Sequence, residues 1–199
     1  MKSSQNAGVA TFSIRQITVV GVLTAITVVL GQSGLGFLII PGLPAKITIM
    51  HIPVIIGAII EGPVVGALVG LLFGIFSIIQ NMMMPTPLSF AFLNPLVSVL
   101  PRVLIGIVSY YAYRFISLKY DSIKIGITAA IGTATNTIGV LGMIYLLYAA
   151  PFAELKKVDV SKVGKIMAGI AVTNGIPEII AAVIITIAIV TPLKKILKR

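Results

Sequence analysis

Long apolar stretches without charge alternate with short polar segments along this chain. The uncharged runs cover residues 16–45, 62–101 and 125–153, and charged residues gather between them. A membrane-spanning helix needs roughly 20 apolar residues, so each run can hold at least one span. The run 62–101 is long enough for two, and the segment Pro85-Thr86-Pro87 marks the break between them. The pattern predicts an all-α integral membrane protein.

Glycine, proline and charged residues divide the chain into six predicted transmembrane helices in one membrane domain, 1–199. The second helix is short for a span, and the fourth carries Pro95, Pro101 and Arg102 in its interior. An apolar, glycine-rich loop follows the first helix, and a polar loop at about 150–164 precedes the sixth. The predicted helices cover about residues 14–31, 47–60, 63–82, 88–114, 125–149 and 165–191.

Composition excludes a soluble domain. The chain is 58% hydrophobic and 10% charged, with a mean hydropathy of +1.12. Its net charge of +10 does not indicate nucleic-acid binding, because Lys and Arg lie at segment ends and no soluble domain presents a basic face. With six spans, nine Lys and Arg residues lie on the side of the two termini and five on the other side. This bias predicts that both termini are cytoplasmic.

Reactive chemistry has little support in the sequence. The chain has no cysteine and one histidine, so a metal-ligand cluster is not expected. A nucleophile elbow, an HExxH motif and a phosphate-binding loop of the GxxxxGK type are all missing. We therefore expect no metal, no cofactor and no enzymatic activity, and the chain by itself has no means of hydrolysing ATP.

Three polar residues are predicted near the middle of the membrane. Counting along the predicted helices places Arg102, Asn136 and Glu178 at similar depth. An isolated charge there costs at least about 2.5–3.5 kcal/mol, so pairing of Arg102 with Glu178 is the natural solution. Two interpretations stay open, namely an internal clamp that locks three helices and direct contact with a ligand.

A second polar set is expected nearer the outer surface. Each member alone is consistent with helix capping or interface hydration, and for His51, which flanks the second helix with Lys46, we favour that interpretation. Together the others are a plausible recognition set for a small polar molecule. They are Lys46, Gln80, Asn81, Asn94 and Asn174.

Small residues recur at a spacing of four on two predicted helices. Gly21 and Ala25 have this spacing on the first helix, and the segment GALVGLLFG repeats it in the third. In lipid, such faces let helix backbones approach closely. They are suited either to internal packing or to docking of another membrane subunit.

The segments HIPVIIGAIIEGPVVGALVGLLFG (51–74) and FLNPLVSVLPRVLIG (92–106) resemble the substrate-binding S component of energy-coupling factor (ECF) vitamin transporters. The resemblance covers nearly the whole chain and is strongest to the pantothenate and riboflavin branch. It implies a six-helix bundle in the bacterial cell membrane that captures a vitamin from outside and associates with a coupling transmembrane subunit and two ATP-binding subunits. In that family a small-residue face on the first helix, commonly a pair of alanines, docks the coupling subunit. Gly21 and Ala25 occupy the matching positions here, with the same spacing but with glycine in place of one alanine.

The leading hypothesis is therefore a vitamin-capture subunit surrounded by membrane lipid, with pantothenate preferred. Pantothenate is an anion and needs a cation, for which Lys46 or Arg102 is suited. Riboflavin would need stacking partners, for which Phe37, Phe90 and Phe92 are candidates. Another B-vitamin or precursor S component, or a standalone proton-coupled carrier that uses Glu178, is the alternative.

Overall fold

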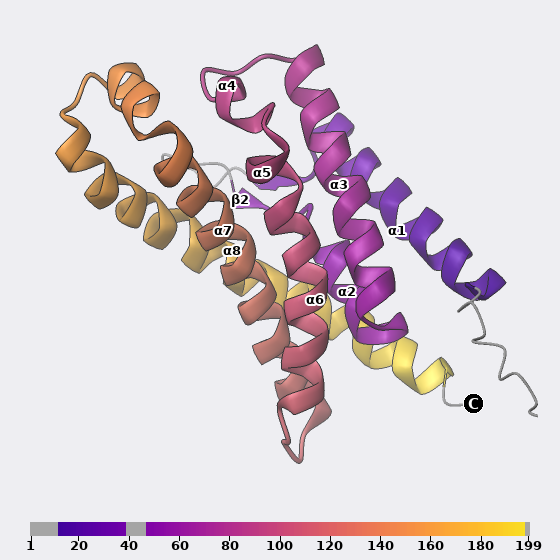
Figure 1. Cartoon of the computed structure of the whole chain (residues 1–199). Helices are drawn as coiled ribbons and strands as arrows, with labels where there is room; N and C mark the ends of the chain where they lie inside the picture. Colours follow the sequence, from indigo (N-terminus) through magenta and orange to yellow (C-terminus); the bar gives the residue numbers. More distant parts are fainter. Residues whose placement is uncertain (1–11, 39–46, 198–199) are drawn as a thin grey trace, which may run out of the picture.

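The computed structural model describes residues 12–38 and 47–197. These residues form a helical bundle with one two-stranded hairpin (Figure 1). In chain order the elements are α1 Ile14–Ser33, β1 Phe37–Leu38, β2 Ile47–Thr48, α2 Ile52–Glu61, α3 Pro63–Met83, α4 Ser89–Phe92, α5 Pro95–Ser98, α6 Leu100–Phe115, α7 Asp121–Lys156 and α8 Val160–Leu197.

Five stretches of the described residues are long and apolar enough to cross a membrane: α1, α3, the segment Pro95–Phe115, α7 and α8. This agrees with the predicted all-α, multi-pass membrane protein. The predicted second span differs, because α2 begins only at Ile52 and has 10 residues. At 1.5 Å per residue it is about 15 Å long, half of the hydrocarbon thickness of about 30 Å. A count of exactly six spans is therefore not supported.

Local sequence signals explain where the first three helices begin and end. Ser13 and Gln16 form a reciprocal capping box at the start of α1, and Gly34 ends that helix in the left-handed conformation. Gly62 has a φ of 100°, which places a tight turn between α2 and α3, and Pro63 occupies the first turn of α3.

The predicted helix 88–114 is divided into α4, α5 and α6. The side chain of Asn94 accepts a hydrogen bond from the Leu96 N–H and so begins a new helix at Pro95. Pro101 lies in the first turn of α6, where a missing N–H is tolerated. Pro95 therefore starts the short α5, and Pro101 lies at the start of the longer α6, where one unbroken helix was expected.

The predicted polar loop 150–164 is largely helical. Helix α7 continues to Lys156 with a kink at Tyr148, because Pro151 cannot donate to the carbonyl four residues earlier. Helix α8 begins already at Val160. In the connection, hydrogen bonds from the hydroxyl and the backbone N–H of Ser161 lower the pKa of the Asp159 carboxyl.

Glycines let the backbones of α3 and α6 pack directly against each other. A Cβ on Gly70 would lie 2.2 Å from the carbonyl oxygen of Arg102, and one on Gly106 would lie 2.2 Å from the carbonyl carbon of Gly66. No side chain fits between these backbones, so the small-residue pattern on α3 serves internal packing. This contact fixes the position of Arg102 on α6.

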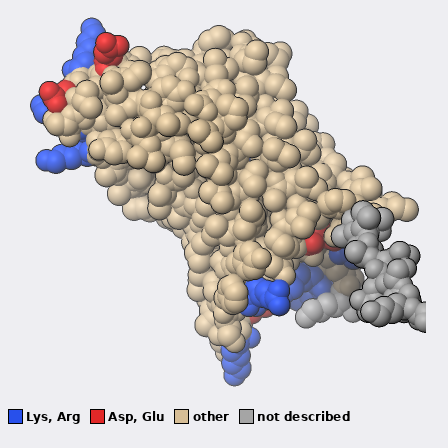
Figure 2. Space-filling model, in the orientation of Figure 1, with Lys and Arg blue, Asp and Glu red and all other residues tan. Residues whose placement is uncertain are grey.

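Charged side chains gather at the two ends of the bundle. Figure 2 shows Lys, Arg, Asp and Glu at the ends of the visible face and a broad uncharged belt between them. At the end where α1 begins and α8 ends, Arg15 pairs with Glu61 at 2.6 Å and Lys194 pairs with Asp121 at 2.6 Å. These pairs lie where helix ends reach a membrane surface.

Candidate functional site

A buried hydrogen bond joins the start of α2 to the middle of α7. His51 is the residue before α2 and is 0% exposed. Its Nε2 lies 2.9 Å from the hydroxyl oxygen of Thr133, whose hydroxyl also donates to the Ala129 carbonyl. The imidazole Nδ1 is buried without a hydrogen-bond partner among the described residues. A buried ring with one satisfied nitrogen leaves the other available to a ligand.

Arg102 lies beside this histidine, on α6. Its side chain is 6% exposed, and its Nη1 donates to the Val97 carbonyl at 2.7 Å. The guanidinium carbon is 5.5 Å from the ring centre of Phe73 and 5.7 Å from that of Phe92. Within the described part of the chain its Nε has no partner, and its charge acts on His51. The Arg102 guanidinium is therefore held by the rings of Phe73 and Phe92 and by the Val97 carbonyl, and its Nε–H is left without an acceptor among the described residues.

Glu178 on α8 contacts the same stretch of α7. The carboxylate is 5% exposed, and Oε1 accepts a 3.0 Å hydrogen bond from the backbone N–H of Thr48 in β2. Oε2 accepts from the hydroxyl of Thr137 at 3.2 Å. Two donors from different elements therefore hold this buried carboxylate in place.

Asn136 lies on α7 between Thr133, which contacts His51, and Thr137, which contacts Glu178. Positions three and four apart share a helix face, so Thr133, Asn136 and Thr137 form one polar patch. The side chain of Asn136 is 7% exposed, and its Oδ1 has no partner in the described residues. We call His51, Arg102, Thr133, Asn136, Thr137 and Glu178 the buried polar layer.

The predicted ion pair between Arg102 and Glu178 is wrong. Salt bridges in the described residues join Arg15 to Glu61 and Lys194 to Asp121 only. Arg102 lies on α6 and Glu178 on α8, and each of these helices packs against α7. Arg102 and Glu178 do not meet, although their predicted depths in the membrane are similar. Each of the two side chains hydrogen-bonds to uncharged groups instead.

Three of the predicted outer residues join helices together. Gln80 on α3 donates to the Gly31 carbonyl of α1 at 2.9 Å. Asn81 donates to the Ser77 carbonyl and accepts from the Ser89 hydroxyl at 2.8 Å. Asn94 donates to the hydroxyl of Tyr148, at the kink of α7, at 3.0 Å. Each of these side chains makes a hydrogen bond to another helix.

The two remaining outer residues stand apart from these contacts. Asn174 on α8 is half-buried and accepts a 3.3 Å hydrogen bond from the neighbouring Thr173 hydroxyl. Lys46 lies outside the described residues. The structure therefore gathers Arg102, Asn136 and Glu178 around α7 and leaves the outer set distributed between helices.

His51 is the residue whose role sequence reasoning missed. Its expected role was helix capping or interface hydration, but its side chain is fully buried, makes no capping hydrogen bond and contacts Thr133. The available signal was its position directly before the apolar segment IPVIIGAII, in a helix too short to reach the outer surface. The start of such a helix lies within the membrane, so a polar residue there is expected to be buried against other helices.

The face of α1 with Gly21 and Ala25 has no partner within the described chain. Both residues are exposed, and a Cβ on Gly21 would meet nothing within 4 Å. Such a face is open to lipid or to another helix.

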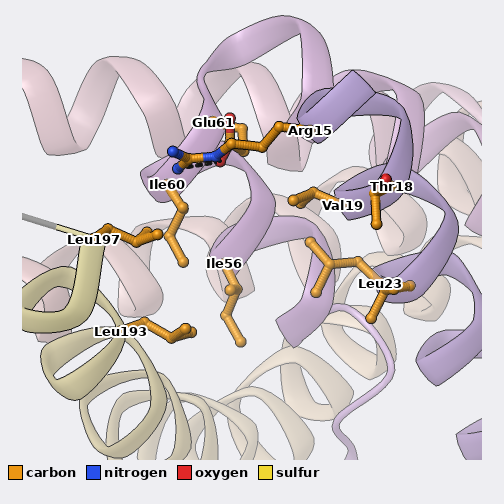
Figure 3. A pocket seen from close by; sticks show the side chains of 10 residues that line it. Arg15, Thr18, Val19, Leu23, Ile56, Ile60, Glu61, Leu193 and Leu197 are labelled. Carbon is orange, nitrogen blue, oxygen red and sulfur yellow. Dashed lines mark hydrogen bonds and ion pairs between the residues drawn. The ribbon is translucent and has the colours of Figure 1, made fainter. Parts of the chain in front are cut away.

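An apolar groove runs between α1 and α8, with α2 as its floor (Figure 3). Two adjoining hollows of about 230 Å³ and 280 Å³ share Val22, Leu23, Ile56 and Leu193. We call this feature the α1–α8 groove. It lies apart from the buried polar layer, with aliphatic walls, and the Arg15–Glu61 ion pair closes one end.

The buried polar layer combines charged and neutral hydrogen-bonding groups. It offers a cation, a carboxylate, an amide and an imidazole. Three of its polar atoms have no partner in the described residues, namely His51 Nδ1 before α2, Arg102 Nε on α6 and Asn136 Oδ1 on α7. Among the described residues no group of three His, Cys, Asp or Glu side chains is placed to hold a metal ion. The layer is suited to an anionic molecule that also carries hydrogen-bonding groups.

Comparison with known proteins identifies the family. The family described as "ECF transporter, substrate-specific component" matches residues 15–190. The chain belongs to the substrate-specific components of ECF transporters. It is thus a multi-pass membrane transport protein, in agreement with the resemblance found in the sequence.

Two relatives of this substrate-specific component carry specific names. The pantothenic acid transporter PanT of Lactococcus lactis subsp. cremoris is 34% identical over 166 residues, which cover 76% of this chain and 80% of the relative. The pantothenate transporter PanT of Leuconostoc mesenteroides subsp. mesenteroides is 27% identical over 175 residues, which cover 85% and 84%. Both similarities extend over most of each chain.

Proposed function

We propose that this substrate-specific component captures pantothenate for import across the bacterial cell membrane. The observation that carries the proposal is the Arg102 guanidinium, which is buried with an unpartnered Nε and no carboxylate partner in the described residues. A buried cation without a counterion favours an anionic ligand. The similarity to two proteins named as pantothenate transporters supports the same substrate.

The groups of pantothenate match those of the buried polar layer. Its carboxylate would accept hydrogen bonds from Arg102, and its amide N–H would donate to the unpartnered Oδ1 of Asn136. Its hydroxyl groups would donate to Glu178, a carboxylate that already accepts from neutral donors. The predicted sites Gln80, Asn81, Asn94 and Asn174, together with Lys46, would line the outer approach.

Calorimetric titration of the purified protein tests this assignment. We expect saturable, stoichiometric binding of pantothenate and at least about 100-fold weaker binding of panthenol, because panthenol replaces the carboxylate with a neutral alcohol. Riboflavin is expected to give no heat. Equal affinity for pantothenate and panthenol would contradict the role of Arg102, and tighter binding of riboflavin would overturn the substrate.

We further propose that transport requires a coupling transmembrane subunit and two ATP-binding subunits. The family description and the exposed face of Gly21 and Ala25 support this arrangement. The alternative is a standalone proton-coupled carrier, favoured by the buried carboxylate of Glu178, which has no cationic partner in the described residues. Proteoliposomes separate the two. Uptake driven by ATP only with the partner subunits supports the importer, and uptake by this chain alone under a proton gradient supports the carrier.

The proposed orientation places both termini in the cytoplasm. Nine Lys and Arg residues on the side of the termini, against five on the other, support it. Because the chain has no cysteine, Lys119→Cys and Lys157→Cys would each introduce a single thiol. An impermeant maleimide should label the second variant in intact cells and the first only after lysis. The opposite labelling would invert the topology.

A further inference from the structure

The position of the proton on the His51 ring follows from its contact with Thr133. The Thr133 hydroxyl has a single proton and donates it to the Ala129 carbonyl at 2.8 Å. The proton in the 2.9 Å contact between His51 Nε2 and the same hydroxyl oxygen therefore comes from the imidazole. A neutral ring protonated on Nε2 has a free lone pair on Nδ1. The unpartnered nitrogen of His51 is thus an acceptor, which needs a donor from a ligand.

The other two protonation states of the His51 ring are disfavoured. Each of them puts a proton on Nδ1, where the described residues offer no acceptor. The doubly protonated ring would also be a second buried cation beside Arg102, and no carboxylate within residues 12–38 and 47–197 forms an ion pair with either side chain. A neutral imidazole with its proton on Nε2 avoids both costs.

Packing holds the His51 ring in place. The ring is 0% exposed and directly precedes the first turn of α2. This turn packs closely on α7, because a Cβ on Gly132 would lie 2.9 Å from the side chain of Ile55. The ring is therefore anchored by its backbone at α2 and by Thr133 on α7, and Nδ1 keeps one direction.

The three unpartnered atoms of the buried polar layer differ in polarity. Arg102 Nε is a donor, whereas Asn136 Oδ1 and His51 Nδ1 are acceptors. In the proposed function the carboxylate of pantothenate meets Arg102 and its amide N–H meets Asn136, which leaves one acceptor. Pantothenate also carries two hydroxyl groups, and Glu178 already accepts two hydrogen bonds. One hydroxyl on Glu178 and one on His51 Nδ1 would use every free group.

We propose that His51 recognises a hydroxyl group of the ligand through Nδ1, and that Thr133 positions the ring by keeping its proton on Nε2. This inference rests on the proposed capture of pantothenate and adds a residue that determines specificity. Analogues that keep the carboxylate and the amide but lack this hydroxyl are rejected, because they leave a buried acceptor unpaired. Arg102 thus selects for charge, and His51 selects for the hydroxyl.

Nitrogen NMR of the purified protein in detergent tests the protonation state of the ring. The chain has one histidine, so labelling with nitrogen-15 histidine and purification through a tag without histidine give signals from His51 alone. We expect a protonated Nε2 and an unprotonated Nδ1 in the free protein. Saturating pantothenate should shift the Nδ1 signal, because the lone pair then accepts a hydrogen bond. A protonated Nδ1, or an Nδ1 signal that saturating pantothenate leaves unchanged, would overturn the proposal.

Calorimetry with pantothenate and its two monodeoxy analogues, each lacking one hydroxyl, tests the recognition. The unaltered protein should bind each analogue about tenfold more weakly than pantothenate. In His51→Gln, whose amide N–H can still donate to Thr133 but which lacks the Nδ1 acceptor, the difference should vanish for one analogue. His51→Asn, with an acceptor oxygen near the position of Nδ1, is the matched control and should retain most of it. Persistence of both differences in His51→Gln would mean that Nδ1 binds a water molecule instead, and would refute the assignment.

A second pair of variants tests the positioning role of Thr133. Thr133→Val removes the acceptor of the Nε2 proton, so NMR should show protonation of both nitrogens in a mixture, and discrimination by the hydroxyl should fall. Thr133→Ser keeps the hydroxyl and should behave like the unaltered protein. An unchanged protonation state in Thr133→Val would contradict this role. Saturable pantothenate binding without a response of His51 would overturn this inference alone, whereas absence of binding would overturn the proposed function as well.

Discussion

The backbone N–H of Thr48 donates a 3.0 Å hydrogen bond to the carboxylate of Glu178, 130 residues further along the chain. This contact ties β2 of the hairpin to the middle of α8, a long helix of the bundle. Any change at Glu178 reaches the hairpin directly.

Replacement of Glu178 should separate its structural role from its charge. Glu178→Ala leaves the Thr48 N–H without its acceptor and should lower the free energy of unfolding by about 1–3 kcal/mol. Glu178→Gln retains an acceptor oxygen and should lose less. Thermal unfolding in detergent measures both. An equal loss would mean that the charge itself, and not the hydrogen bond, stabilises the hairpin.

Replacement of Arg102 should affect binding far more than folding. Arg102→Met removes the charge but fills the space between the rings of Phe73 and Phe92. Pantothenate affinity should fall about 100-fold, because a hydrogen bond to a charged group contributes about 2–3 kcal/mol. Arg102→Lys keeps the charge and should bind with intermediate affinity. Calorimetry measures the affinities, and unchanged binding by the methionine variant would remove Arg102 from the site.

A bulky residue on the small-residue face of α1 should uncouple capture from transport. Gly21→Phe and Ala25→Phe should bind pantothenate normally, because both positions are exposed and far from the buried polar layer. Uptake by the reconstituted complex should be lost if the coupling subunit docks there. Val29→Phe, at an exposed position on the same helix, is the control. Loss of binding in the glycine or alanine variants would instead assign this face to the core.

The α3–α6 contact should tolerate no side chain at Gly70. In Gly70→Ala the new methyl group would lie 2.2 Å from the carbonyl oxygen of Arg102, so α6 must move. We expect a loss of about 1–3 kcal/mol of stability together with weaker pantothenate binding. Gly142→Ala is the matched control, since a Cβ there meets nothing within 4 Å, and it should be neutral or stabilising by up to about 1 kcal/mol. Similar behaviour of the two variants would contradict the close approach.

The sequence predicted the helices well where apolar length and local caps agree. Helices α1 and α3 match their predicted ranges to within about two residues, because Ser13 and Pro63 mark their starts. The same signals were available at Asn94-Pro95, but the apolar stretch around them favoured one continuous helix. Near Pro151 the opposite error occurred, since charged residues suggested a loop where α7 only bends.

The burial of the candidate polar residues was easier to predict than their hydrogen-bond partners. Arg102, Asn136 and Glu178 are all buried, as their estimated depth in the membrane required. Their partners depend on helix rotation and on which helix lies between the others, and neither property is encoded in spacing along one chain. The contact between His51 and Thr133 joins residues 82 positions apart in the sequence, so it could be identified only from the three-dimensional structure.

The short length of α2 has an electrostatic consequence. A helix of 10 residues that begins at Ile52 and ends beside Arg15 places its N-terminus about halfway across the hydrocarbon core. The peptide dipoles of a helix sum to roughly half a positive charge at that end. The field at the buried polar layer therefore includes a positive contribution from backbone dipoles that no change of pH removes.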